Sequence, residues 1–251
     1  MAKQKGIIKI KGTIGDMTFY KTADGHIVKE KSEISKQKIM TGASFARTRE
    51  NMSEFGRAGK ASKTLRNAIR THLLNAKDGR VVSRLTKEMM RVLQADATSV
   101  RGLRNVIDGE TEMLQNFNFN LQAIWSATMF APYTMGIDRA TGQLSVDIPA
   151  FSPSQMIVAP DGSTHFKIVS AGSSVNFTDD TFVTREFETA VLPWTPANTA
   201  AINIVHGLPP AGTDPLFLLL GIQFFQEVNG VHYPLRNGAF NSLNIVAVSG
   251  V

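Results

Sequence analysis

The sequence TGASFARTRENMSEFGRAGKASKTLRNAIRTHLLNAKDGRVVSRLTKEMMRVL, from Thr41 to Leu93, decides how the first part of the chain folds. Its apolar residues recur at helical spacing on both sides of a turn at Lys77–Arg80, which predicts two amphipathic helices. A turn this short between two such helices favours an antiparallel pair. Because Gly56 and Gly59 are weak helix formers, we expect the first helix to bend or break near Gly56.

Basic side chains form one row along each predicted helix, opposite the apolar residues. The rows are Lys60, Lys63, Arg66 and Arg70 on the first helix and Arg80, Arg84, Lys87 and Arg91 on the second. If both rows face the same way, they make a surface that can neutralise several phosphates of a nucleic acid. The sequence has no recognised DNA- or RNA-binding motif, and these helices lack interleaved aromatic residues for base stacking. Nucleic-acid binding is therefore supported by charge alone.

The charges of the chain are strongly separated along the sequence. Residues 1–104 hold 23 of the 27 Lys and Arg but 9 of the 21 Asp and Glu, a net charge of +14, whereas residues 105–251 carry −8. This separation indicates two modules, a basic one at 1–110 and an acidic one at 111–251. The separation suggests either a polyanionic partner for the basic module or an acidic surface that meets it, on the same chain or on another copy. The alternative is a solvated basic face that has no partner.

The residues before the helices have the alternation of short strands. We expect a small β meander at Ile7–Lys11, Asp16–Thr22 and His26–Glu30, with a hairpin turn at Asp24-Gly25. So few strands rarely stand alone in water, so this meander should dock on another surface. An extended segment can also add to the sheet edge of another copy, and the candidate residues for this pairing are Ile8, Ile10, Met17 and Phe19.

After the helices the hydrophobic period changes toward two, which is typical of strands. The predicted strands are Glu112–Phe119, Leu121–Met129, Tyr133–Asp138, Leu144–Ile148, His165–Ser170, Thr181–Leu192, Ala200–His206, Leu216–Glu227, Val231–Pro234 and Leu243–Val248. Asn229-Gly230 is the strongest hairpin signal. Leu216–Phe225, LFLLLGIQFF, is apolar on both faces and predicts a central strand. The fold class is therefore α+β: a β meander and a helical hairpin, then an antiparallel β-sandwich of the jelly-roll kind.

No catalytic or metal-binding motif stands out in the sequence. It has no phosphate-binding glycine loop, nucleophile elbow or zinc-protease helix. The five histidines are scattered, and none has a second histidine at ligand spacing, so we expect no metal site, cofactor or enzymatic activity. Trp125, Trp194 and Tyr233 could form an aromatic platform for a sugar, although aromatics this far apart are more often core residues.

The composition of the chain and its N-terminal residues indicate the cellular compartment. The chain is 43% hydrophobic and 19% charged, as expected for a globular protein, and it contains no cysteine for disulfides or thiolate metal sites. The charged Met1–Lys5 segment is not followed by an apolar run of signal-peptide or membrane-span length. These features predict a cytoplasmic protein without a membrane partner.

Three short motifs lie between Lys5 and Arg70: KGTIG at 11–15, TFYK at 18–21 and FARTREN at 45–51, the last followed by EFG at 54–56. With these motifs the segment, about a quarter of the chain, resembles an uncharacterised protein family of Bacteroidota genomes. The resemblance implies a cytoplasmic product of unknown role and assigns no functional residue.

The sequence thus favours a non-enzymatic structural protein that self-assembles into a ring, filament or particle, as a phage-derived subunit would. In this hypothesis the basic N-terminal module meets the acidic sandwich of another copy. The alternatives are a nucleic-acid-binding protein that uses the basic helices and a carbohydrate-binding sandwich.

Overall fold

The structure is a computed structural model that describes residues 1–31 and 34–250. The chain forms two compact units, Met1–Glu50 and Asn51–Val251. The contacts thus divide the chain between Glu50 and Asn51 rather than at the predicted boundary of 110/111. The reason is that the helices after residue 51 share a hydrophobic core with the strands of the C-terminal part.

The N-terminal unit holds a four-stranded antiparallel sheet with the order β1-β4-β3-β2. Its strands are β1 (Ala2–Lys3), β2 (Gly12–Ile14), β3 (Met17–Thr22) and β4 (Gly25–Glu30). Gly15, with a φ of 55°, lies in the β2–β3 turn, and Gly25, with a φ of 116°, begins β4 directly after the β3–β4 turn; both have the positive φ that glycine tolerates. Two helices follow, α1 (Lys36–Thr41), which Ser35 caps, and the 3-10 helix η1 (Ala43–Phe45).

The predicted first strand, Ile7–Lys11, is not formed. Ile8 and Ile10 lie in the irregular segment between β1 and β2, where the Gln4 side chain bonds both the backbone N–H and the carbonyl of Ile10. Met17 and Phe19 lie in β3, and both pair with β2 on one side and with β4 on the other. None of these four residues therefore sits on the open edge of a strand, which corrects the expected edge-pairing role.

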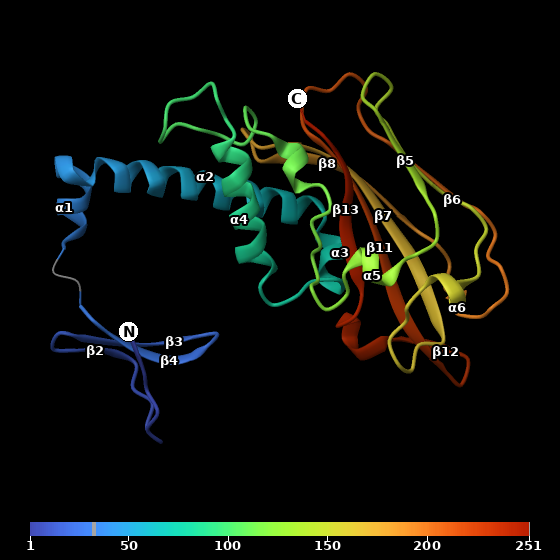
Figure 1. The fold of residues 1–251 in the computed structure, drawn as a ribbon, viewed down its shortest axis with the longest axis horizontal. Helices are drawn as coiled ribbons and strands as arrows, with labels where there is room; N and C mark the ends of the chain where they lie inside the picture. The colour runs from blue at the N-terminus through green and yellow to red at the C-terminus, as the bar shows by residue number, and fades with distance from the viewer. Residues whose placement is uncertain (32–33, 251) are drawn as a thin grey trace. The chain divides into compact units, whose positions relative to one another are not determined.

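The helices of the second unit follow the predicted apolar pattern but differ in their geometry. They are α2 (Ala46–Ala68), which begins in the N-terminal unit, α3 (Arg70–Asn75) and α4 (Val81–Gln94). The break falls at Ile69, whose φ of −111° and ψ of 21° are not helical, while Gly56 and Gly59 stay inside α2. Figure 1 shows α4 running across the direction of α2 rather than alongside it, in contrast to the expected antiparallel pair. No helix within residues 1–31 and 34–250 has the length and apolarity needed to span a membrane.

The C-terminal part is an antiparallel β-sandwich, as predicted. Its larger sheet contains β7 (His165–Asn176), β8 (Thr181–Glu188), β9 (Leu192–Pro193), β11 (Leu216–Val228), β12 (Val231–Pro234) and β13 (Ser242–Ser249). The smaller sheet has the order β10-β6-β5 and is made of β5 (Thr134–Asp138), β6 (Gln143–Ile148) and β10 (Ile202–Gly207). The Asn229-Gly230 turn joins β11 to β12 with φ values of 53° and 77°, as a two-residue hairpin requires.

Strand β11 is the centre of the larger sheet and separates two hydrophobic cores. It pairs with β7 along one edge and with β12 and β13 along the other. Phe217 and Leu219 belong to the core shared with α2, α3 and α4, whereas Leu218 and Leu220 belong to the core shared with β6 and β10. Figure 1 shows these helices on one side of the larger sheet and β5 and β6 on the other. Each buried Leu or Phe contributes about 1.5–3 kcal/mol, so the apolar pattern of β11 fixes this three-layer arrangement.

Two of the predicted strands are wrong. In place of Glu112–Phe119 and Leu121–Met129 the structure has the short helices η2 (Thr111–Leu114) and α5 (Trp125–Thr128). Asn116 adopts a φ of 66°, and the Asn118 carbonyl side chain accepts from the backbone N–H of Trp125. These local asparagine conformations compete with a strand ladder. Two further short helices are α6 (Pro153–Met156) and η3 (Leu235–Gly238).

Candidate functional site

The basic row of α2 is partly engaged by the sandwich. The ammonium group of Lys60 lies 2.7 Å from a carboxylate oxygen of Asp180 in the turn between β7 and β8, and the Thr64 hydroxyl donates to the same carboxylate. The hydrogen bond from Lys60, opposed by burial and aided by Thr64, holds the pKa of Asp180 below its ordinary value. Lys63 and Arg70 are exposed, and half-buried Arg66 donates to the Ser62 carbonyl.

The basic row of α4 contains one arginine with a structural role. Arg84 donates to Asp78 at 2.5 Å and to the carbonyl oxygens of Asn118 and Phe119 at 2.7 and 3.1 Å. Burial opposes ionisation of Asp78, but the backbone N–H groups of Leu121 and Arg80 and then Arg84 lower its pKa overall. Arg84 therefore ties the turn before α4 to the segment that follows η2.

Three basic side chains of the two rows that have acidic partners end in different places. Lys60 ends at the β7–β8 turn, Arg84 ends at residues 118–119, and Arg91 pairs with Glu88 on its own helix at 2.9 Å. Arg80 and Lys87 are exposed. Residues 51–251 contain 16 Lys and Arg and 16 Asp and Glu, so the second unit is neutral, while residues 1–50 contain 11 and 5 and carry +6. The excess positive charge thus belongs to the N-terminal unit.

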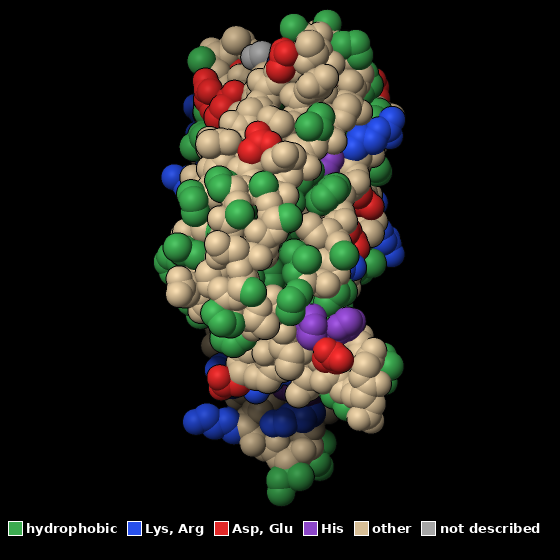
Figure 2. Space-filling view, turned by 90° about the vertical axis from the view of Figure 1, so that its right-hand side faces the viewer, with side chains coloured by type: hydrophobic (Ala, Val, Ile, Leu, Met, Phe, Trp, Pro, Cys, Tyr) green, Lys and Arg blue, Asp and Glu red, His purple; other side chains and the backbone are tan. Residues whose placement is uncertain are grey.

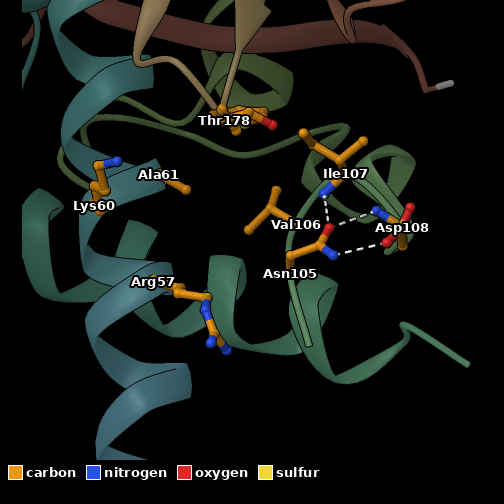
Figure 3. A pocket seen from close by; sticks show the side chains of 9 residues that line it. Arg57, Lys60, Ala61, Asn105, Val106, Ile107, Asp108 and Thr178 are labelled. Atoms are coloured by element: carbon orange, nitrogen blue, oxygen red, sulfur yellow. Dashed lines mark hydrogen bonds between the residues drawn. The ribbon is translucent and has the colours of Figure 1, made fainter. Parts of the chain in front are cut away.

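A polar loop at 96–108 packs beside α2 and lines a pocket of about 510 Å³. The buried Glu54 carboxylate accepts from the Gly102 N–H at 2.7 Å, and Arg57 donates to the carbonyls of Gly102 and Arg104. In Figure 3 the Asn105 side chain bonds the backbone N–H groups of Ile107 and Asp108. Arg57 and Lys60 line the pocket but are already bound to protein oxygens, so their charges stabilise the loop and the β7–β8 turn.

A second buried carboxylate, that of Asp96, also anchors that loop. The Asp96 carboxylate accepts from the N–H groups of Thr98, Ser99 and Asn105 and from the Thr98 hydroxyl. Burial alone would raise the pKa of Asp96, but these four donors hold it far below its ordinary value. A carboxylate bonded in this way is a loop anchor rather than a general base.

Two buried histidines lie on either side of the larger sheet. Nε2 of His72, on α3, lies 3.2 Å from the Ser170 carbonyl oxygen. Because a carbonyl oxygen can only accept a hydrogen bond, Nε2 of His72 carries the proton and donates. His206 of β10 lies with Nε2 2.9 Å from the Ser170 hydroxyl oxygen, and that hydroxyl donates to the Leu219 carbonyl. Since the hydroxyl proton is used on Leu219, His206 donates and does not act as a base toward Ser170. Burial, with a smaller contribution from His72, lowers the pKa of His206 to about 4.

The structure brings together three residues that the sequence pattern did not connect. His165, Glu227 and His232 lie with one ligand atom of each within 4.8 Å of the others. Glu227 and His232 are opposite each other in the β11–β12 hairpin. The predicted turn at Asn229-Gly230 was a signal for that pair, whereas His165 joins it only through the pairing of β7 with β11.

The expected aromatic platform is not formed. Trp125 is buried in the core between the two sheets, and the partly buried Trp194 packs against that core. Their indole N–H groups donate to the Tyr133 hydroxyl and the Ile157 carbonyl. Tyr233, on β12, is exposed. The two tryptophan rings are thus used for packing, because a buried indole needs an internal acceptor.

Comparisons with known proteins identify no family for this chain. No protein-family model matches the sequence, and no curated protein matches it. Among solved structures, the human F-spondin reeler domain matches 49% of this chain and 97% of its own, with 14% identity and a TM-score of 0.18. A likeness this low does not inform the function of the chain.

Proposed function

We propose that the protein is a non-enzymatic structural subunit that self-associates, with its N-terminal unit docked on a second copy. One observation carries the proposal: no side chain that the structure describes between residues 1 and 50 is buried. A folded sheet normally hides at least one face. The N-terminal unit therefore needs a surface that its own residues do not supply.

The uncovered side chains of this unit are large and apolar. Ile7 is fully exposed, Ile8 is 82% exposed, and Ile14 and Met17 are more than half exposed. Exposed apolar side chains that cluster in one small unit are typical of an interaction surface. Docking them would remove apolar area from water at about 25 cal/mol per Å².

The acidic residues of the C-terminal part support a second copy as the partner. The N-terminal unit carries +6 and residues 105–251 carry −8, although residues 51–104 bring the second unit as a whole to neutrality. The edge strand β8 of the sandwich carries exposed Phe182 and Val183, which offer apolar contacts, and exposed Glu186 beside exposed Arg185. A contact between two different surfaces of the same chain is heterologous and builds rings or filaments.

Paired variants test the proposal. The double variant Ile7→Asp/Ile8→Asp should be monomeric by size-exclusion chromatography with light scattering at concentrations where the unchanged protein is oligomeric. Val100→Asp is the matched control, because Val100 is also an exposed apolar residue but lies in the second unit. If the double variant and the control keep the same oligomeric mass, the N-terminal unit is not the docking element.

The nucleic-acid alternative is less well supported. Of the eight basic residues proposed for it, Lys60, Arg84 and Arg91 each have an acidic partner within the chain. Binding of a labelled duplex with a steep salt dependence would support it, since each phosphate contact releases counterions. We expect no such binding at physiological salt.

A further inference from the structure

Three neighbouring strands present the side chains of His165, Glu227 and His232 at one end of the larger sheet. His165 begins β7 and pairs with Phe225 of β11, and Glu227 follows Phe225 by two residues and so lies on the same face. His232 of β12 is directly opposite Glu227. Figure 2 shows two histidine side chains side by side at the surface, next to an acidic side chain.

The distances within this cluster suit a shared ion better than hydrogen bonds. The Nε2 atoms of His165 and His232 lie 3.5 and 3.9 Å from the same oxygen, Oε2 of Glu227. Hydrogen bonds from nitrogen to oxygen span about 2.7–3.2 Å. Ligand atoms about 2.0–2.1 Å from a tetrahedral zinc ion lie roughly 3.3 Å apart. Small side-chain rotations therefore bring the three ligand atoms to the spacing of a metal site.

A threonine hydroxyl orients two of the three residues. Thr164 Oγ1 lies 2.9 Å from Nδ1 of His165 and accepts from the backbone N–H of Glu227 at 2.7 Å. When Nδ1 carries the proton and donates to Thr164, the lone pair of His165 is on Nε2, which faces Glu227. A bonded second nitrogen is the usual arrangement around a metal-ligating histidine.

The neighbouring charge does not oppose a cation. Lys167, two residues along β7, has its ammonium group 2.9 Å from Glu188. Its charge is therefore balanced on the side away from the cluster, and Glu227 supplies a negative ligand. Glu227 and His232 have side chains that are 42% and 36% exposed, so an ion can reach them from solvent.

We propose that His165, Glu227 and His232 form a binding site for a divalent transition metal ion of the zinc class. Two imidazoles and one carboxylate are a donor set that suits Zn²⁺, whereas Ca²⁺ and Mg²⁺ prefer oxygen ligands alone. The three protein ligands leave a fourth position for water. The site lies within the second unit and goes beyond the proposed self-association, on which it does not depend.

The test uses the full chain and Zn²⁺ alone, by isothermal titration calorimetry. The unchanged protein should bind one Zn²⁺, and His232→Gln and Glu227→Gln should each weaken this binding by at least about tenfold. Thr164→Val should weaken it by a similar factor, although Thr164 is not a ligand. His26→Gln is the control and should bind as the unchanged protein does, because His26 lies in the N-terminal unit.

A second measurement guards against misfolding of a variant. His232 and Glu227 are exposed near the hairpin turn, so their variants should keep the circular dichroism spectrum of the unchanged protein. Zn²⁺ should raise the unfolding temperature of the unchanged protein and of His26→Gln but not of His232→Gln. Absence of stoichiometric binding, or equal binding by His232→Gln and Glu227→Gln, would overturn the proposal.

Discussion

His206 donates from Nε2 to the hydroxyl oxygen of Ser170 at 2.9 Å, which joins β10 of the smaller sheet to β7 of the larger one. The bond is fully buried, and the Ser170 hydroxyl continues it to the Leu219 carbonyl of β11. A series of hydrogen bonds thus crosses the apolar interior of the sandwich. A buried polar group without its partner costs about 1–3 kcal/mol, so these hydrogen bonds fix how the two sheets meet.

The titration of His206 should make the second unit less stable in mild acid. The pKa of His206 is about 4 in the folded protein, against an ordinary value of 6.5. Between these pH values the unfolded chain binds a proton that the folded chain does not. As far as His206 is concerned, the free energy of unfolding is therefore highest above about pH 6.5. It falls by roughly 3 kcal/mol as the pH approaches 4.

Urea unfolding at pH 7 and pH 4.5 measures this loss. The range from pH 4.5 to 7 lies above the pH at which Asp78, Asp96 and Asp180 titrate, because their pKa values are lowered from 3.8. His206→Gln should flatten the pH dependence whatever its effect on stability at pH 7. An unchanged slope in this variant would show that another group titrates in the window.

Gly172 should be intolerant of alanine. A Cβ added at Gly172 would lie 2.7 Å from Cβ and 3.0 Å from Cγ of His206, which the Ser170 bond holds in place. We expect Gly172→Ala to lower the free energy of unfolding by about 1–3 kcal/mol. Gly207→Ala is the control, since a Cβ there meets nothing within 4 Å. Equal chemical denaturation midpoints for the two variants would contradict the packing described.

Substitutions at Arg84 and Arg70 compare a structural arginine with an exposed one from the predicted basic rows. Arg84→Met removes the donors to Asp78, Asn118 and Phe119, so we expect a loss of about 1–3 kcal/mol in the free energy of unfolding. Arg70→Met, at an exposed position, should change stability by no more than about 0.5 kcal/mol. Denaturation curves of similar midpoint would refute the structural role of Arg84.

The strand pattern of the sandwich could be predicted where apolar burial dominates. Leu216–Val228 is apolar on both faces because both faces meet a core, and the Asn229-Gly230 turn follows from its positive φ angles. Prediction failed where side chains compete locally with the backbone. The Asn116 and Asn118 conformations replace a strand with irregular structure. The helix breaks at Ile69, a fully buried residue of the core shared with the sandwich, and not at Gly56 or Gly59, which helix propensity had indicated.

The candidate sites depended still more on tertiary structure. Most residues of the basic rows lie on helices, but Arg80 precedes α4 and Arg70 begins α3 after the break. The partners Asp180 and Asn118 come from distant segments that no helical spacing could indicate. His165 meets Glu227 only because β7 and β11 pair in their observed register. A shift of one residue in that register would turn His165 to the other face.

Self-association through the N-terminal unit is tested most directly by the mass of the unchanged protein in solution. Sedimentation velocity over a wide concentration range, at low and high salt, should show oligomers that grow with concentration and weaken with salt, because the proposal pairs the +6 N-terminal unit with acidic residues of another copy. A single monomeric species of 27.4 kDa at every concentration and salt would contradict the proposal.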